Sequence, residues 1–286
     1  MTLLPFLPDD LSPGDQRFRS LDFSRVCAQR IASLEDPLLR RGYDRLWQEF
    51  GHQGEMETLE VIVSRLRWFP AAQIQGRWLR YDLVVMTSGE DLVGVADHVA
   101  IASETPSGPR VVVHQSHIVV EPAWRRRGVA AWMRSMPLQT GRACLEAAGL
   151  PLHSPVTLVA EVEHPDPKDE AKTLRLCSFQ RAGFLKVDPR FVDYQQPDFR
   201  PFSDIDAEGR IHPLPLALVL RRVGRESESS VTSEELRQTV ECLYNIYGQS
   251  CRAQDMEGLW EQTARLSQGP GRIPLIPPTG QTFDCP

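Results

Sequence analysis

The sequence predicts an α+β fold in which a mostly antiparallel mixed sheet is flanked by helices and followed by a helical C-terminal extension. Two amphipathic helical patterns precede any strand pattern. Three consecutive runs rich in β-branched residues then follow one another with short connections, and two more helical patterns follow residue 225. With 286 residues, 41% of them hydrophobic, the chain is long and apolar enough to bury a core.

The N-terminal part begins with a Pro-rich, polar extension over residues 1–35, which contains one short helical pattern near residues 23–31. Asp36 and Pro37 are then typical of an N-cap followed by a proline in the first helical position. Apolar residues repeat at helical spacing from there to Gly51, and a second apolar stripe runs over residues 59–66. We therefore expect two helices before the sheet.

The central part alternates strands and helices. Residues 80–87, 91–102 and 110–120 predict an antiparallel meander, because turn-forming residues join them. Residues 130–148 then predict a helix and residues 156–163 a strand. Asp166 and Pro167 repeat the cap-and-proline signal for a helix that ends at Gly183, and residues 213–221 predict a last strand.

The C-terminal part starts with an acidic, serine-rich stretch after residue 225, which is typical of a linker. Thr232 and Glu235 form a capping-box pair ahead of an apolar stripe, and a further helix carries Met256 and Leu266. After Ser267 the chain is rich in Gly and Pro, which predicts poor order. The expected organisation is an N-terminal extension over 1–35, a central domain over 36–225 and a helical extension over 226–286.

Composition and charge exclude several classes of protein. The sequence contains no run of about 18 apolar residues, so we expect no membrane span. The N-terminus lacks the basic region of a signal peptide. The six cysteines are scattered without a CxxC pair, so we expect reduced thiols in a cytoplasmic protein and no metal site. The net charge of −6 argues against general nucleic-acid binding.

The segment from Ile118 to Ala130 is the most informative part of the chain. A buried-looking strand runs into Pro122, then into Arg125, Arg126, Arg127 and Gly128, which open a helix. Helix N-termini present unpaired N–H groups and bind phosphates, and a glycine lets the backbone approach a bulky anion. These residues predict either a diphosphate-binding turn or a basic helix start whose charges are simply solvated.

This segment resembles the acetyl-CoA-binding signature of the GNAT superfamily of N-acetyltransferases, with Arg125, Gly128 and Ala130 at the matching positions. Residues 178–184, which end on Gly183 and Phe184, resemble the same family's helix-end motif. The order of elements agrees with that fold over residues 36–222. No Gly-Lys-Ser/Thr follows, so a P-loop is excluded.

The resemblance implies acetyl-CoA as the co-substrate. The pantetheine arm would pair with the backbone of the strand that contains Ile118 to Val120. The diphosphate would bind the amides of Arg126 to Ala130. That strand and the strand at 156–163 would separate to form the cleft. The implied cofactor-binding residues are Ile118, Val119, Val120, Arg125, Arg126, Arg127, Gly128, Val129 and Ala130.

The resemblance also implies a general acid and a general base. The family's usual acid is a tyrosine four residues before the glycine of Gly-Phe, but here Phe179 occupies that position. Tyr194 is the candidate within the chain for the general acid. The alternatives are that water protonates the thiolate, or that Tyr194 only has a packing role. For the base we expect His114, because period-two alternation places it with Ser116, Ile118 and Val120 on one strand face, while His117 points the other way. The alternative for His114 is a hydrogen-bonded strand histidine.

Glu161 and Glu163 share a face at the end of the predicted strand 156–163. Glu161 is a candidate for binding a cationic acceptor and Glu163 for relaying a proton, although both are also typical of exposed strand ends. We expect an amine acceptor, with a longer acyl chain or a non-catalytic CoA-binding module as alternatives. The C-terminal helices would cap the acceptor site or form a homodimer contact, unless they only pack.

Overall fold

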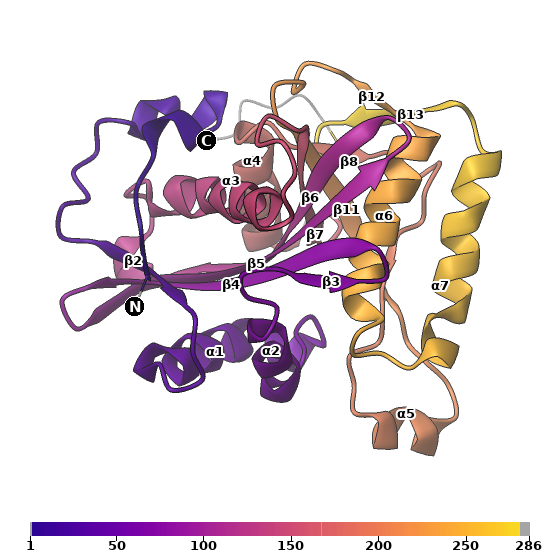
Figure 1. Cartoon of the computed structure of the whole chain (residues 1–286), viewed down its shortest axis with the longest axis horizontal. Coiled ribbons are helices and arrows are strands. Elements are labelled where there is room, and N and C mark those ends of the chain that lie inside the picture. Colours follow the sequence, from indigo (N-terminus) through magenta and orange to yellow (C-terminus); the bar gives the residue numbers. More distant parts are fainter. Residues whose placement is uncertain (1, 167, 281–286) are drawn as a thin grey trace. The chain divides into compact units, whose positions relative to one another are not determined.

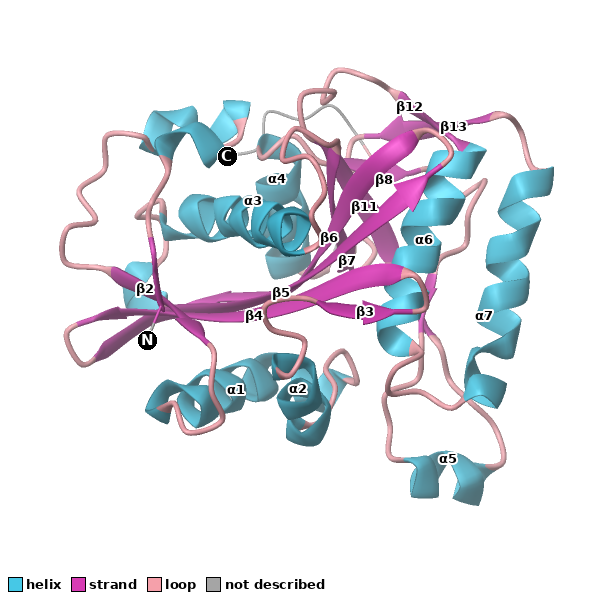
Figure 2. Cartoon of the chain, viewed as in Figure 1, coloured by secondary structure: helices cyan, strands magenta, loops and turns pink. Residues whose placement is uncertain are grey.

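The computed structural model describes residues 2–166 and 168–280, and the chain divides into two compact units. The first comprises Met1–Gln53 and Thr58–Leu158, and the second Gly54–Glu57 and Val159–Pro286. The division at Leu158 falls inside the 36–225 range that the sequence assigns to one domain. Both units combine strands and helices, so the predicted α+β class is confirmed (Figure 2).

The first unit is built on an antiparallel sheet with strand order β1-β2-β4-β5-β6, and β3 also pairs with β4. The three predicted strands of the meander are confirmed as β4, β5 and β6. The short helix expected near 23–31 is wrong, because residues 27–31 form β2, which pairs with β4. The expectation that two helices precede any strand is wrong as well, because β1 and β2 come before the first α-helix. The strands are β1 (Thr2–Leu4), β2 (Cys27–Ile31), β3 (Ala72–Ile74), β4 (Arg77–Ser88), β5 (Asp91–Thr105) and β6 (Gly108–Val120).

Helices cover both faces of this sheet: α1 (Pro37–Phe50) and α2 (Leu59–Leu66) lie on one face and α3 (Val129–Ala147) on the other (Figure 1). All three were predicted, and the Asp36 carboxylate accepts a hydrogen bond from the Leu38 amide as the sequence indicates. Gly42 lets α1 approach the side chains of Val85 and Val95. On the opposite face, Ile118 and Val120 pack with the core beneath α3.

A β-bulge in β6 overturns the predicted alternation of its side chains. Asp97 pairs with His117 and His98 pairs with Gln115, so Ser116 is skipped in the register. Because one extra residue exchanges the two faces of a strand, His114 and His117 share the face covered by α1, and Ile118 and Val120 take the other. The prediction that His114 shares a face with Ile118 and Val120 is therefore wrong.

The second unit has strand order β7-β11-β8-β13-β12, with a separate β9–β10 pair. The chain crosses from the first unit to the second within β7. Its strands are β7 (Val156–Val162), β8 (Leu185–Val187), β9 (Gln195–Gln196), β10 (Leu214–Pro215), β11 (Ala217–Arg222), β12 (Ser230–Thr232) and β13 (Arg272–Ile276). Its helices are α4 (Glu170–Arg181), α5 (Phe202–Glu208), α6 (Ser233–Tyr247) and α7 (Ala253–Arg265).

Two boundaries of this unit differ from the prediction. The helix α4 begins at Glu170 with Asp169 as its N-cap, three residues after the expected Asp166-Pro167 start, and Pro167 itself lies outside the described residues. The segment predicted to be poorly ordered contains β13, which pairs with both β8 and β12. Residues 281–286 of that predicted tail, including Cys285, lie outside the described residues.

The two C-terminal helices form as predicted. Thr232 caps α6 by accepting a hydrogen bond from the Glu235 amide at 3.1 Å. The apolar stripe of Leu236, Val240 and Leu243 is buried, as expected of a stripe that packs against the core.

Candidate functional site

The loop between β6 and α3 has the backbone of an anion-binding turn. A short 3-10 helix, Pro122–Trp124, leads into three exposed arginines, Arg125 to Arg127. Arg126 has φ +61° and Gly128 has φ +79°, so two residues of the turn adopt the left-handed conformation. Left-handed residues in a turn point successive backbone N–H groups toward one side, which forms a concave site for anions.

Gly128 is the N-cap of α3, and among the described residues no side chain caps this helix end. The first amides of a helix have no partner within the helix, and the 19-residue α3 places the positive end of its dipole here. These features fit a diphosphate, because amides and the arginine side chains can share its charge. The loop therefore suits the cofactor that the sequence resemblance implies.

Several contacts hold the loop in this shape. Arg125 Nε donates to the carbonyl oxygen of Val120 at 3.0 Å, which joins the end of β6 to the start of the turn. The Arg127 guanidinium lies 5.6 Å from the centre of the Trp124 ring. Glu121 forms an ion pair with Arg45 of α1. Arg125 is therefore partly engaged within the loop, and Arg126 and Arg127 carry its outward charge.

His114, the predicted base, is buried on β6 with its Nδ1 atom 3.2 Å from the Ser116 hydroxyl. Ser116 is the bulge residue, so this contact ties the histidine to the irregular part of the strand. The hydrogen bond agrees with the alternative reading of a strand histidine and leaves the catalytic role a prediction.

A second histidine, His117, lies on the same face as His114, although the alternation in the sequence predicts that it points the other way. His117 Nδ1 lies 2.9 Å from Asp97 Oδ1, and the Tyr81 hydroxyl lies 3.2 Å from Asp97 Oδ2. Burial opposes ionisation of Asp97, but the charge of His117, its hydrogen bond to the carboxyl and the charge of Arg65 outweigh it, so the pKa of the carboxyl is lowered. A carboxylate accepting from Nδ1 leaves the imidazole lone pair on Nε2. Only the bulge brings this pair together, and no sequence pattern marks it.

The structure brings Glu161 and Tyr194 together in the second unit. The Tyr194 hydroxyl donates to Glu161 Oε1 at 2.6 Å, and the Tyr247 hydroxyl of α6 donates to Glu161 Oε2. Burial, with the nearby Glu161 charge, raises the pKa of Tyr194 well above its usual value. The hydroxyl proton that Tyr194 would release as a general acid is thus engaged in a hydrogen bond to the Glu161 carboxylate. The contact of Tyr247 with the same carboxylate was missed by sequence reasoning.

Glu163 lies one residue beyond β7 and has different partners from Glu161. It pairs with Arg175 of α4 and lies 4.0 Å from Lys172 Nζ. Phe179, at the position of the family's usual acid, packs edge to face against Phe184 with ring centres 5.1 Å apart. The predicted residues of the second unit therefore form two separate clusters, one around Glu161 and one around Glu163.

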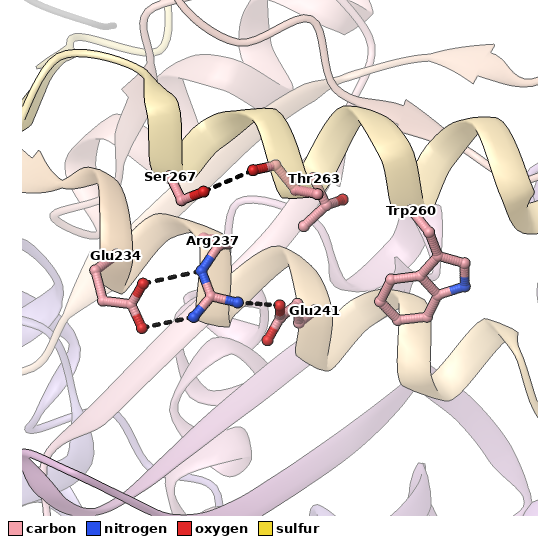
Figure 3. A pocket seen from close by; sticks show the side chains of 7 residues that line it. Glu234, Arg237, Glu241, Trp260, Thr263 and Ser267 are labelled. Carbon is pink, nitrogen blue, oxygen red and sulfur yellow. Dashed lines mark hydrogen bonds and ion pairs between the residues drawn. The ribbon is translucent and has the colours of Figure 1, made fainter.

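A hollow of about 400 Å³ lies between α6 and α7 (Figure 3), lined by Glu234, Arg237, Glu241, Trp260, Thr263, Ala264 and Ser267. Arg237 bridges Glu234 and Glu241, so the charges that line it are paired with one another. In the described part of the chain, no group of three His, Cys, Asp or Glu residues could hold a metal ion. None of the helices described over residues 2–166 and 168–280 has the length and apolar character to cross a bilayer.

No protein-family model and no curated protein matches the chain. Solved structures that it resembles include an aminoglycoside acetyltransferase from an uncultured soil metagenomic sample, in complex with trehalose, with 12% identity and a TM-score of 0.30 over 52% of this chain and 82% of that one. A GCN5-related N-acetyltransferase from Sphaerobacter thermophilus shares 16% identity, with a TM-score of 0.33 over 59% of this chain and 45% of its own.

FeeM, an N-acyl amino acid synthase from uncultured soil microbes, shares 12% identity, with a TM-score of 0.34 over 71% of this chain and 93% of its own. All three likenesses have TM-scores below 0.5.

Proposed function

We propose that the protein is an acyltransferase that moves an acetyl group from acetyl-CoA to an amine acceptor by direct transfer. The observation that carries the proposal is the β6–α3 loop, where the left-handed Arg126 and Gly128 precede a 19-residue helix whose N-terminus lacks a side-chain cap among the described residues. The same residues carry the sequence resemblance to acetyl-CoA-binding proteins.

The chain's residues would act in three ways. The amides of Arg126 to Ala130 and the exposed guanidinium groups would hold the diphosphate. The amine nitrogen would attack the thioester carbonyl, and the carbon–sulfur bond would break to release the CoA thiolate. A base must accept the proton of the amine, and the thiolate must receive a proton from an acid or water. His114 is the proposed base, with Glu163 and Tyr194 as further candidates for proton transfer and Glu161 for acceptor binding.

Calorimetry with the full chain tests the cofactor. Titration with CoA and with acetyl-CoA should give saturable binding. The double variant Arg126→Gln/Arg127→Gln should weaken it about tenfold or more, because charge-assisted hydrogen bonds are worth roughly 1.5–3 kcal/mol each. Arg67→Gln, an exposed arginine just after α2, is the matched control and should bind as the wild type does. An absence of heat and saturation in the wild type contradicts the proposal.

Phe179 favours a second candidate, a CoA-binding module without catalysis. A phenyl ring packed on Phe184 has no proton to give to a thiolate. Such a module should bind CoA but consume no acetyl-CoA with polyamines, aminoglycosides or lysine peptides. An enzyme that uses a longer acyl group should instead prefer a longer-chain acyl-CoA in the same assay.

A further inference from the structure

The N-terminal extension packs along α3 as a continuous strap, defined here as residues 5–23. The sequence describes this segment only as Pro-rich and polar. In the structure it contains two short 3-10 helices, and Ser12 caps the second by accepting a hydrogen bond from the Asp15 amide at 3.1 Å. The segment therefore has a defined conformation of its own.

Polar contacts anchor the strap along the length of α3. The Asp15 carboxylate lies 3.1 Å from Arg134 Nη2, and both side chains are buried. The Asp10 carboxylate, also buried, lies 2.7 Å from Arg142 Nη2. Charges that are buried and paired hold one geometry, because separating them leaves an uncompensated charge. The register of the strap on the helix is thus set by two carboxylates.

Aromatic packing fixes the strap over the first turns of α3. Phe6 and Phe23 each pack edge-on against Trp132, with ring centres 5.5 Å and 5.8 Å away. Phe18 packs against the neighbouring cluster of Leu11, Ala131 and Trp132. The strap therefore reaches the N-terminal end of α3, which directly follows the anion-binding loop.

The strap touches the loop itself at Gly128. A Cβ atom built on Gly128 would lie 2.4 Å from Leu21 Cδ1 and 2.9 Å from Phe18 Cδ1, closer than real Cβ contacts occur. These two side chains thus lie directly against the backbone of the helix N-cap. Gly128 is consequently buried, whereas the three arginines before it are exposed.

We propose that Phe18 and Leu21 are positioning residues for cofactor binding, holding Gly128 and the first turn of α3 in the shape that receives the CoA diphosphate. This inference rests on the proposed function. Because coupling between two sites is reciprocal, docking of the strap strengthens CoA binding, and CoA binding in turn holds the strap against the helix. The strap then acts as an ordered wall of the cofactor site.

The central variant is Leu21→Ala, chosen because Leu21 is 41% exposed and its truncation leaves most of the core intact. Calorimetry with CoA should show five- to tenfold weaker binding, and Phe18→Ala should have at least as large an effect. Leu34→Ala is the matched control, since Leu34 is 49% exposed in the same unit but lies outside the strap. Its CoA affinity should equal that of the wild type.

Hydrogen exchange gives a readout that a merely structural role would not move. Saturating CoA should slow exchange several-fold in peptides covering residues 13–21 of the wild type and leave β2 unchanged. Wild-type CoA affinity in both strap variants, or exchange at 13–21 that ignores CoA, overturns the inference while the proposed function stands. If the wild-type protein binds no CoA, the proposed function fails, and this inference with it.

Discussion

His114 and His117 lie on one face of β6, and their surroundings differ in a way that bears on catalysis. His114 contacts a neutral hydroxyl, Ser116. His117 contacts a buried carboxylate, Asp97, which also accepts from Tyr81. A carboxylate behind an imidazole orients the ring and stabilises its protonated form. Proton removal from an amine therefore has two candidate histidines, His114, which the sequence indicated, and His117, which the structure adds.

Substitution of each histidine separates the two roles. If His114 is the base, His114→Ala should lower kcat/KM for acetyl-CoA and an accepted amine by about 10²- to 10⁴-fold and abolish the limb that rises with pH. If His117 is the base instead, His117→Ala should have this effect on kcat/KM and on the pH profile, and Asp97→Asn should reduce kcat/KM as well. Steady-state kinetics across pH measures both.

An unchanged pH profile in His114→Ala removes His114 from the mechanism. Ser116→Ala serves as the control, because it deletes the hydroxyl partner of His114 and leaves the Asp97–His117 pair in place.

At the scale of elements, β13 shows how a strand can be absent from the sequence pattern. Residues 272–276 contain Pro274, which has no N–H to donate, and the surrounding segment is rich in Gly and Pro. The strand forms because its partners supply the pairing on both sides. Leu275 pairs with Val187 of β8, and Ile273 pairs with Val231 of β12. The Pro274 carbonyl also accepts a hydrogen bond from the Asp188 amide at 3.2 Å.

Truncation of a side chain in β13 should therefore destabilise the protein. Ile273 is 1% exposed, so Ile273→Ala should lower the free energy of unfolding by about 2–5 kcal/mol, measured by urea denaturation with circular dichroism. Arg272→Ala, an exposed position on the same strand, should change it by no more than about 0.5 kcal/mol. Equal effects of the two substitutions would show that the strand contributes little packing.

At the scale of the whole molecule, the buried polar groups of the first unit make stability depend on pH. Burial lowers the pKa of His98 from 6.5 to about 4, outweighing the opposing charges of Asp97 and Asp82. Between these two values the unfolded chain binds a proton that the folded chain does not. The contribution of His98 to stability is therefore fully present above pH 6.5 and is lost as the pH falls toward 4.

The expected loss over that window is on the order of 3 kcal/mol, since each pKa unit corresponds to about 1.4 kcal/mol. Urea denaturation at pH 7.5, 6, 5 and 4 should show this loss in the wild type. His98→Gln, which does not titrate, should show a correspondingly flatter acid limb. His153→Gln, an exposed position, should keep the wild-type dependence. A variant at His98 that is as acid-sensitive as the wild type would contradict the assignment.

Local signals in the sequence determined most of the elements. The Asp36 and Thr232 caps, the apolar stripes of α1, α2 and α6 and the β-branched runs of β4 to β6 act over a few residues, so they can be recognised without the fold. The glycine and arginines that open α3 are likewise a local pattern, and the structure gives them the left-handed turn that such a pattern requires.

Tertiary structure decided the features that depend on residues far apart in the chain. The bulge at Ser116 exists only in the pairing of β6 with β5, and it places His114 and Ile118 on opposite faces of the strand. The partners of Glu161 come from α6 and the segment before β9, and the strap meets Gly128 from more than 100 residues away. Sequence spacing carries no information about such contacts, because they form only when burial of the core brings distant segments together.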